Sequence, residues 1–258
     1  MDLEAALALQ KVGDGWAATV PQGWGQGRTT FGGLVAAYLV RAVEAEQVRP
    51  VRGVDVTFLE PVQAGPVLLR VGQVREGKYV THAQAELIAG DKVAAVGRFL
   101  LADDVPGELD AVPEAPQPAT PFDDTLLMPD IEGMTPEFAR NLQIRYGEGP
   151  VPFSGGSAAT TGGWVRAVHP VSGAAAMLIH IDAWPPPVLG MATRPMAAST
   201  VRWHVLFHAD VSGADGEQWS WFRSEAAWRS GRLATAVGSL VRDGRSVAYA
   251  EQTVAMYF

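Results

Sequence analysis

The sequence contains no cysteine among its 258 residues. A chain without cysteine has no disulfide framework, no thiol nucleophile and no cysteine metal site. Basic residues are also scarce, because 20 lysines and arginines stand against 28 aspartates and glutamates and give a net charge of −8. Nucleic-acid binding needs a basic surface against phosphate, so we expect no nucleic-acid partner.

No apolar run approaches the ~20 residues that a membrane-spanning helix needs. The N-terminal sequence, MDLEAALALQ, carries acidic residues where a secretory signal carries lysine or arginine. We therefore expect a cytoplasmic protein that does not associate with membranes. Hydrophobic residues make up 48% of the chain, which is enough for a substantial core. The length fits one large domain or two of roughly 100–150 residues.

Residues 30–47 predict the helix around which the first part of the chain folds. Every residue from Leu34 to Val43 is apolar except Tyr38 and Arg41. A helix that is apolar on nearly all sides is buried, and here strand-rich sequence follows it. The four predicted strands are Gly53–Glu60, Val67–Val74, Tyr79–Ile88 and Lys92–Leu101. The pattern indicates a sheet wrapped around one buried helix.

The second half of the chain repeats this pattern after a break rich in proline and acidic residues, which we predict to be a surface linker. Gly173–Asp182 is a second apolar, helix-length stretch. The strands predicted after it are Ser199–Ala209, Trp219–Trp228, Leu233–Arg242 and Ser246–Met256. We predict glycine-rich turns at 154–163. The repeat predicts two similar subdomains, residues 1–104 and 138–258, joined by the linker 105–137.

Two glycines open the first predicted helix, and a loop that carries tryptophan and glycine precedes them. The loop runs from Trp24 to Arg28, and Phe31, Gly32 and Gly33 follow it closely. The first amides of a helix have no intrahelical partner, and a glycine without a side chain lets a ligand approach them.

Three polar residues lie in, or at the ends of, the elements predicted for the second half. Asp182 closes the apolar helix, Thr200 opens the next strand ahead of Phe207-His208, and Gln252 lies in the last strand. Together with the glycine-led helix, their order resembles the TesB-like acyl-CoA thioesterases (the acyl-CoA thioesterase II family). Two features depart from the family pattern: three prolines follow soon after Asp182, and the segment from Asp182 to Thr200 is short.

The resemblance implies an α+β double hotdog fold, with two antiparallel sheets that each wrap around a central helix and join edge to edge. It implies hydrolysis of an acyl-CoA thioester by activated water, without a metal or another cofactor. A homodimer or higher homo-oligomer is expected from exposed sheet edges. The alternatives are a hotdog hydratase or dehydratase of acyl thioesters, and a non-catalytic acyl-CoA-binding hotdog protein.

The resemblance also assigns roles to the polar residues. Asp182 is the base that orients water, Thr200 positions the same water, and Gln252 holds both side chains. The amides of Gly32 and Gly33 are candidate donors to the oxyanion. In the first half, the aligned positions hold Arg98 and about Val51 in place of Gln252 and Thr200. One site per chain is therefore expected.

Each of these residues also has a structural interpretation. Asp182 is suited to a solvated turn, and a helix C-terminus disfavours its charge. Thr200 and Gln252 are ordinary strand residues, and Gly32 and Gly33 allow a helix to pack closely on a sheet.

Other types of site find little support in the sequence. His204 and His208 lie about 13 Å apart in a strand, too far for one metal. His180 and Asp182 lack a third ligand, and Gly155-Gly156-Ser157 does not complete a nucleophile elbow.

Overall fold

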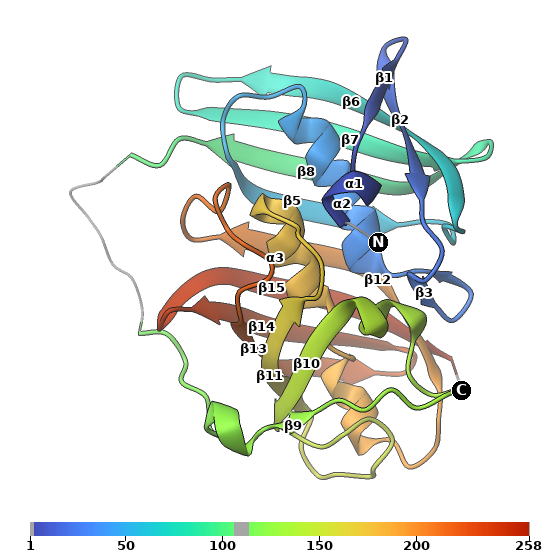
Figure 1. Cartoon of the computed structure of the whole chain (residues 1–258), viewed down its shortest axis with the longest axis vertical. Coiled ribbons are helices and arrows are strands. Elements are labelled where there is room, and N and C mark those ends of the chain that lie inside the picture. The colour runs from blue at the N-terminus through green and yellow to red at the C-terminus, as the bar shows by residue number, and fades with distance from the viewer. Residues whose placement is uncertain (1–2, 106–113, 258) are drawn as a thin grey trace.

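The computed structural model describes residues 3–105 and 114–257, which form a large antiparallel sheet with two helices packed against it (Figure 1). The first half contributes the helices α1 (Leu3–Ala6) and α2 (Gly32–Glu44). Its main strands are β1 (Gln10–Val12), β2 (Gly15–Val20), β5 (Val51–Phe58), β6 (Gly65–Glu76), β7 (Val80–Ala89) and β8 (Lys92–Ala102). A small separate hairpin pairs β3 (Gly25–Gln26) with β4 (Thr29–Thr30).

The second half contains one α-helix, α3 (Gly173–Asp182), within the bounds that the sequence predicts. Its main strands are β10 (Leu142–Glu148), β11 (Thr160–Ala167), β12 (Ala197–Phe207), β13 (Ser220–Ser230), β14 (Leu233–Arg242) and β15 (Arg245–Tyr257). Three short 3₁₀ turns occupy Phe122–Asp124, Glu137–Asn141 and Pro187–Met191.

The order of strands across the sheet confirms the internal repeat. From the middle outward, the first half runs β5-β8-β7-β6-β2 and the second half runs β12-β15-β14-β13-β11. The two halves meet where β5 pairs antiparallel with β12, from Gly53 opposite Leu206 to Thr57 opposite Arg202. The two sheets were expected to join edge to edge, and the structure differs from that expectation only in that they are continuous. Backbone hydrogen bonds run through the seam, and the described strands of both halves form one sheet of thirteen.

The helices α2 and α3 pack side by side in opposite directions, so each end of the pair brings the two halves together (Figure 1). Ten residues of α2 and nine of α3 are buried, which explains why both read as apolar on nearly every side. One hydrophobic cluster includes residues of both helices and both halves of the sheet. A shared core of this kind fixes where the two helix ends lie.

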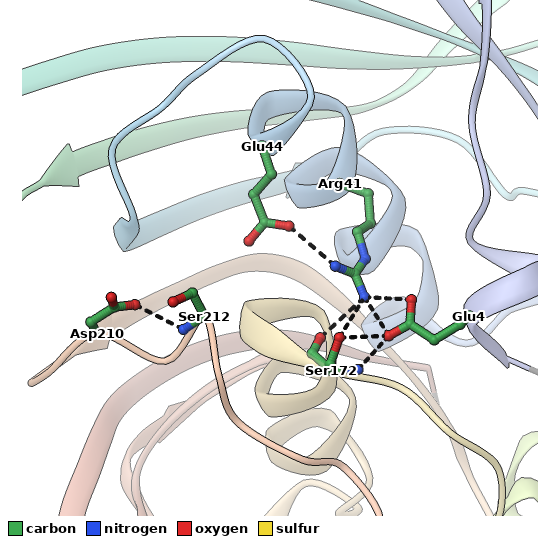
Figure 2. Close-up of polar contacts among 6 residues, drawn as sticks. All are labelled: Glu4, Arg41, Glu44, Ser172, Asp210 and Ser212. Atoms are coloured by element: carbon green, nitrogen blue, oxygen red, sulfur yellow. Dashed lines mark hydrogen bonds and ion pairs between the residues drawn. The ribbon is translucent and has the colours of Figure 1, made fainter.

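A charged cluster joins the helices at one end of the pair (Figure 2). Glu4 accepts hydrogen bonds from Arg41 of α2 at 2.7 Å and from the amide of Ser172, the N-cap of α3, at 2.6 Å. Its carboxylate therefore offsets the positive end of α3 and the charge of Arg41 together. Burial raises the pKa of nearby Glu44, and the ion pair with Arg41 opposes that shift. The candidate site lies at the opposite end of the two helices α2 and α3.

Two segments differ from the sequence-based prediction. The glycine-rich stretch predicted as turns at 154–163 ends inside β11, which begins at Thr160. The predicted linker contains β9 (Leu126–Leu127), which pairs with β10 at the edge of the sheet, while residues 106–113 of that linker lie outside the described residues. Short strands of this kind carry too few residues for a readable alternation.

Candidate active site

Asp182, Thr200 and Gln252 meet at the end of the helix pair opposite the charged cluster. Asp182 is the last residue of α3, Thr200 lies near the start of β12, and Gln252 lies within β15. The Gln252 Nε2 group donates to Asp182 Oδ1 at 3.0 Å and to Thr200 Oγ1 at 2.8 Å. Gln252 lies 70 positions after Asp182 and 52 positions after Thr200, and its carboxamide joins both side chains.

A β-bulge turns Thr200 toward the other two side chains. Trp203 lies opposite Gln252 in the pairing of β12 with β15, so both side chains share the inner face. Strict alternation would place Thr200, three residues before Trp203, on the outer face. The register shifts between Thr200 and Arg202, and Thr200 comes to lie opposite Val254, on the same face as Gln252. The extra residue of the β-bulge, between Thr200 and Arg202, therefore brings the Thr200 hydroxyl to the Gln252 carboxamide.

The first half contributes the N-terminus of α2 to this site. The amide of Gly33 donates to Asp182 Oδ2 at 2.6 Å, across the boundary between the two halves. A β-carbon at Gly32 would lie 2.9 Å from the same oxygen, and one at Gly33 would lie 3.1 Å from the Asp182 β-carbon. Both glycines therefore allow the close approach of the two helices. The amide of Gly33 is engaged by the carboxylate, whereas that of Gly32 has no acceptor among the residues described.

The surroundings of Asp182 keep the pKa of its carboxyl group close to neutral pH. Burial raises the pKa of the Asp182 carboxyl from 3.8 to about 7, while the hydrogen bonds from Gly33 and Gln252 pull it down. The unfavourable charge at the C-terminus of α3 is offset because the carboxylate faces the positive N-terminus of α2. A carboxyl group with a pKa near 7 is a stronger base than a solvated one and is still ionised at physiological pH.

The histidines do not join this constellation. His180 is buried two residues before Asp182, but its ring contacts Ser220 Oγ at 2.9 Å and the Gly216 carbonyl at 3.0 Å. Burial lowers the pKa of His180 to about 3, so the ring is neutral and structural. His204 pairs with Asp55 at 2.9 Å, an aspartate–histidine pair that the sequence analysis missed. It lies on the outer face, because the neighbouring Trp203 points inward.

No group of three or more histidine, aspartate or glutamate side chains within residues 3–105 and 114–257 is arranged to hold a metal ion. The same described part of the chain has no helix long and apolar enough to cross a membrane.

A cavity that the sequence does not reveal opens beside Gln252. It lies between the end of α3 and the inner face of the sheet of the second half, and it encloses about 20 Å³, room for about one water molecule. Trp184, Trp203 and Phe222 form its aromatic walls. Its floor is formed by small residues, Ala236, Gly238 and Ala250. The cavity is therefore a small, mostly apolar space next to the polar constellation.

Family comparison divides the chain into two matching regions. Residues 20–102 match the model of the acyl-CoA thioesterase N-terminal domain, and residues 110–256 match the model of the acyl-CoA thioesterase C-terminal domain. Among curated protein sequences, no match to this chain is found.

Solved structures share the fold over nearly the whole chain. A hot dog fold protein of unknown function from Alicyclobacillus acidocaldarius superposes with a TM-score of 0.88 at 21% identity, covering 98% of this chain and 97% of the other. A tesB protein from Mycobacterium avium subsp. paratuberculosis gives a TM-score of 0.78 at 18% identity, covering 99% and 98%. An acyl-CoA thioesterase II from Mycobacterium marinum gives 0.73 at 17% identity, covering 99% and 98%. At these identities the likeness shows the fold alone, which is the hotdog fold.

Proposed function

Because the chain belongs to the acyl-CoA thioesterase family and is an acyl-CoA thioester hydrolase, we propose that Asp182, Thr200 and Gln252 carry out the hydrolysis by activating one water molecule. The observation that carries this proposal is the carboxamide of Gln252, which donates to both Asp182 and Thr200. Once Gln252 donates to the Thr200 oxygen, the hydroxyl proton of Thr200 is free to point at a water.

The proposed reaction begins with a water between Asp182 and Thr200. Thr200 donates to the water oxygen, and the water donates to Asp182, so that a lone pair of the water faces the thioester carbonyl carbon. Asp182 accepts the proton as the carbon–oxygen bond forms. The carbon–sulfur bond then breaks, and the proton passes from Asp182 to the departing CoA thiolate. Free acid and CoA are the products.

The oxyanion donor in this mechanism is the amide of Gly32. The sequence predicts both glycine amides for this role, but the amide of Gly33 already donates to Asp182. We therefore assign Gly33 to holding the base and Gly32, at the N-terminus of α2, to the developing negative charge. The two glycines have separate tasks in this proposal.

Thr200→Val is expected to lower kcat by about 10–100-fold, because one hydrogen bond to the reacting water and its charged partner is lost. Thr200→Ser keeps the hydroxyl and should retain most of the activity. Release of free thiol from a panel of acyl-CoA thioesters measures both variants. If Thr200→Val hydrolyses these thioesters at the wild-type rate, Thr200 does not position the water.

Division into subdomains 1–104 and 138–258 with the linker 105–137 is part of the same proposal, supported by the mirrored strand order of the two halves. We further propose a cytoplasmic location, a place in lipid metabolism and self-association into a homodimer or higher homo-oligomer. Exposed apolar side chains on the edge strands support self-association: Val12 of β1 and both leucines of β9.

A further inference from the structure

The helix α2 begins after a residue whose side chain cannot cap it. Phe31 is the N-cap, a position where serine, threonine, aspartate or asparagine usually accepts a hydrogen bond from the first helical amides. A phenyl ring cannot accept such a bond. The Gly33 amide instead donates to Asp182 of the other half, at 2.6 Å. The geometry of that bond therefore depends on what holds this end of α2 in place.

The ring of Phe31 fills the space next to Gly33. Its Cε1 and Cζ atoms lie 2.6 and 2.7 Å from the position that a β-carbon of Gly33 would occupy. The ring is fully buried, and Trp24 packs against it with ring centroids 6.1 Å apart. A shift of the Phe31 ring therefore changes the contact that sets where the Gly33 amide lies.

Phe138 covers this ring from the second half. It belongs to the 3₁₀ turn Glu137–Asn141, which directly precedes β10. Its side chain is buried and stacks on Phe31, with ring centroids 4.1 Å apart and planes 9° apart. The same turn is tied to the loop before α2, because Asn141 Nδ2 donates to the Gly23 carbonyl at 2.8 Å. A ring stack and a hydrogen bond therefore join the turn to this loop.

The contacts form one continuous path from Phe138 to Asp182. The path leaves the second half at Phe138, passes through Phe31 and Gly33 of the first half, and returns to the second half at the carboxylate. The second half therefore contacts the start of α2 at two points. One point is the ring stack on the N-cap, and the other is the hydrogen bond from the Gly33 amide.

We propose that Phe138 is a positioning residue for the hydrolysis. It holds the Phe31 ring against Gly33 and thereby keeps the Gly33 amide on the Asp182 carboxylate. The inference rests on the proposed function, because it takes Asp182 to be the base. Phe138 acts only through other residues in this proposal, so its effect must disappear when the base is removed.

Phe138→Ala should lower kcat for acyl-CoA hydrolysis by about 10–100-fold and leave KM within about 3-fold of the wild-type value. The space left by the ring lets Phe31 move away from Gly33, and a displacement of about 1 Å at a reacting group can cost about 100-fold in rate. Phe138→Leu keeps part of the apolar bulk and should show a smaller loss in the same direction. Thiol release measures both variants at a temperature where circular dichroism shows them folded.

A double-mutant cycle separates positioning from a general loss of stability. When Asp182→Asn has already removed the base, the further change Phe138→Ala should alter the residual kcat by less than about 2-fold. Residues that act through one another give non-additive effects, whereas independent residues give additive ones. The cycle therefore reports whether Phe138 acts through Asp182.

Phe122→Ala is the matched control, because it also removes an aromatic ring from a 3₁₀ turn before β10. Phe122 packs against Trp164 and Trp219 of the second half, with ring centroids 5.5 and 5.2 Å away. Its loss leaves the stack on Phe31 in place. The variant should keep the wild-type kcat even where its Tm falls.

A wild-type kcat in folded Phe138→Ala, or the same fold-loss with and without Asp182→Asn, would overturn the inference and leave the proposed mechanism standing. If Asp182→Asn itself kept the wild-type kcat, Asp182 would not be the base, and the inference would fail with the proposed mechanism.

Discussion

Asp182→Asn should reduce kcat for acyl-CoA hydrolysis by about 10²–10⁴-fold, the range expected when a general base is removed. The asparagine retains the shape of the side chain and can still accept from the Gly33 amide. Its own amide can donate to Gln252 once the Gln252 carboxamide rotates by half a turn. Loss of activity is therefore expected without loss of the fold, and thiol release from acyl-CoA measures it.

The same variant should be more stable than the wild type above neutral pH. The pKa of Asp182 is raised from 3.8 to about 7 in the folded protein. Between these two values the folded state binds more protons than the unfolded state, so the stability of the wild type falls as pH rises through about 7. Removing the charge should recover about 1–4 kcal/mol at pH 8, less than the full shift implies because the carboxylate is partly exposed.

Thermal unfolding at pH 5 and pH 8 checks this result. The Tm difference in favour of Asp182→Asn should be largest at pH 8 and clearly smaller at pH 5. It should disappear only below about pH 3.8, where the carboxyl is neutral in the unfolded state as well as in the folded state. Asp55→Asn is the control, because Asp55 pairs with His204 on the outer face. An active Asp182→Asn enzyme would exclude Asp182 as the base, whatever its stability.

Gly33→Ala should lower kcat/KM by about 100-fold, since small displacements of reacting groups have effects of that size. A β-carbon at this position would lie 2.6 Å from Phe31 Cε1 and 3.1 Å from the Asp182 β-carbon. Phe31 cannot move aside, because its ring is fully buried and stacks on Phe138 with centroids 4.1 Å apart. The strain must therefore separate α2 from α3 and shift the carboxylate.

Gly72→Ala is the matched control for this change. A β-carbon at Gly72 meets nothing within 4 Å, so activity and stability should stay close to those of the wild type. Gly33→Ala should also cost about 1–3 kcal/mol in unfolding free energy through overpacking. Unchanged kcat/KM in Gly33→Ala would show that the helix contact does not hold the base in place.

The repeat and the buried helices were predictable because they depend on local patterns. The apolar stretch of α3 gives its bounds directly, and the repeated order of predicted strands makes β7 and β8 the counterparts of β14 and β15. Strand β11 was not predicted, since Gly162 and Gly163 interrupt its alternation. Those glycines are required by neighbouring backbones, because a β-carbon at Gly163 would collide with the Arg145 carbonyl.

The sequence predicts which residues form the candidate site, but it does not predict how they are arranged. Asp182, Thr200 and Gln252 were identified through a family resemblance, while each side chain alone has an ordinary structural interpretation. The bulge at Val201 and the hydrogen bond from Gly33 to Asp182 depend on long-range packing across the two halves. No local sequence pattern near Val201 or Gly33 encodes these contacts.

The pH dependence of kcat/KM tests most directly the claim that the partly buried carboxylate of Asp182 at the helix junction is the base. Since Asp182 must be ionised to accept the proton, kcat/KM should rise with pH through an apparent pKa of about 7 and then level off. Gln252→Leu removes a hydrogen bond that lowers the Asp182 pKa, so the rising limb should move to higher pH in that variant. A kcat/KM that is constant from pH 5.5 to 8.5, or a limb that persists in the residual activity of Asp182→Asn, would contradict the account.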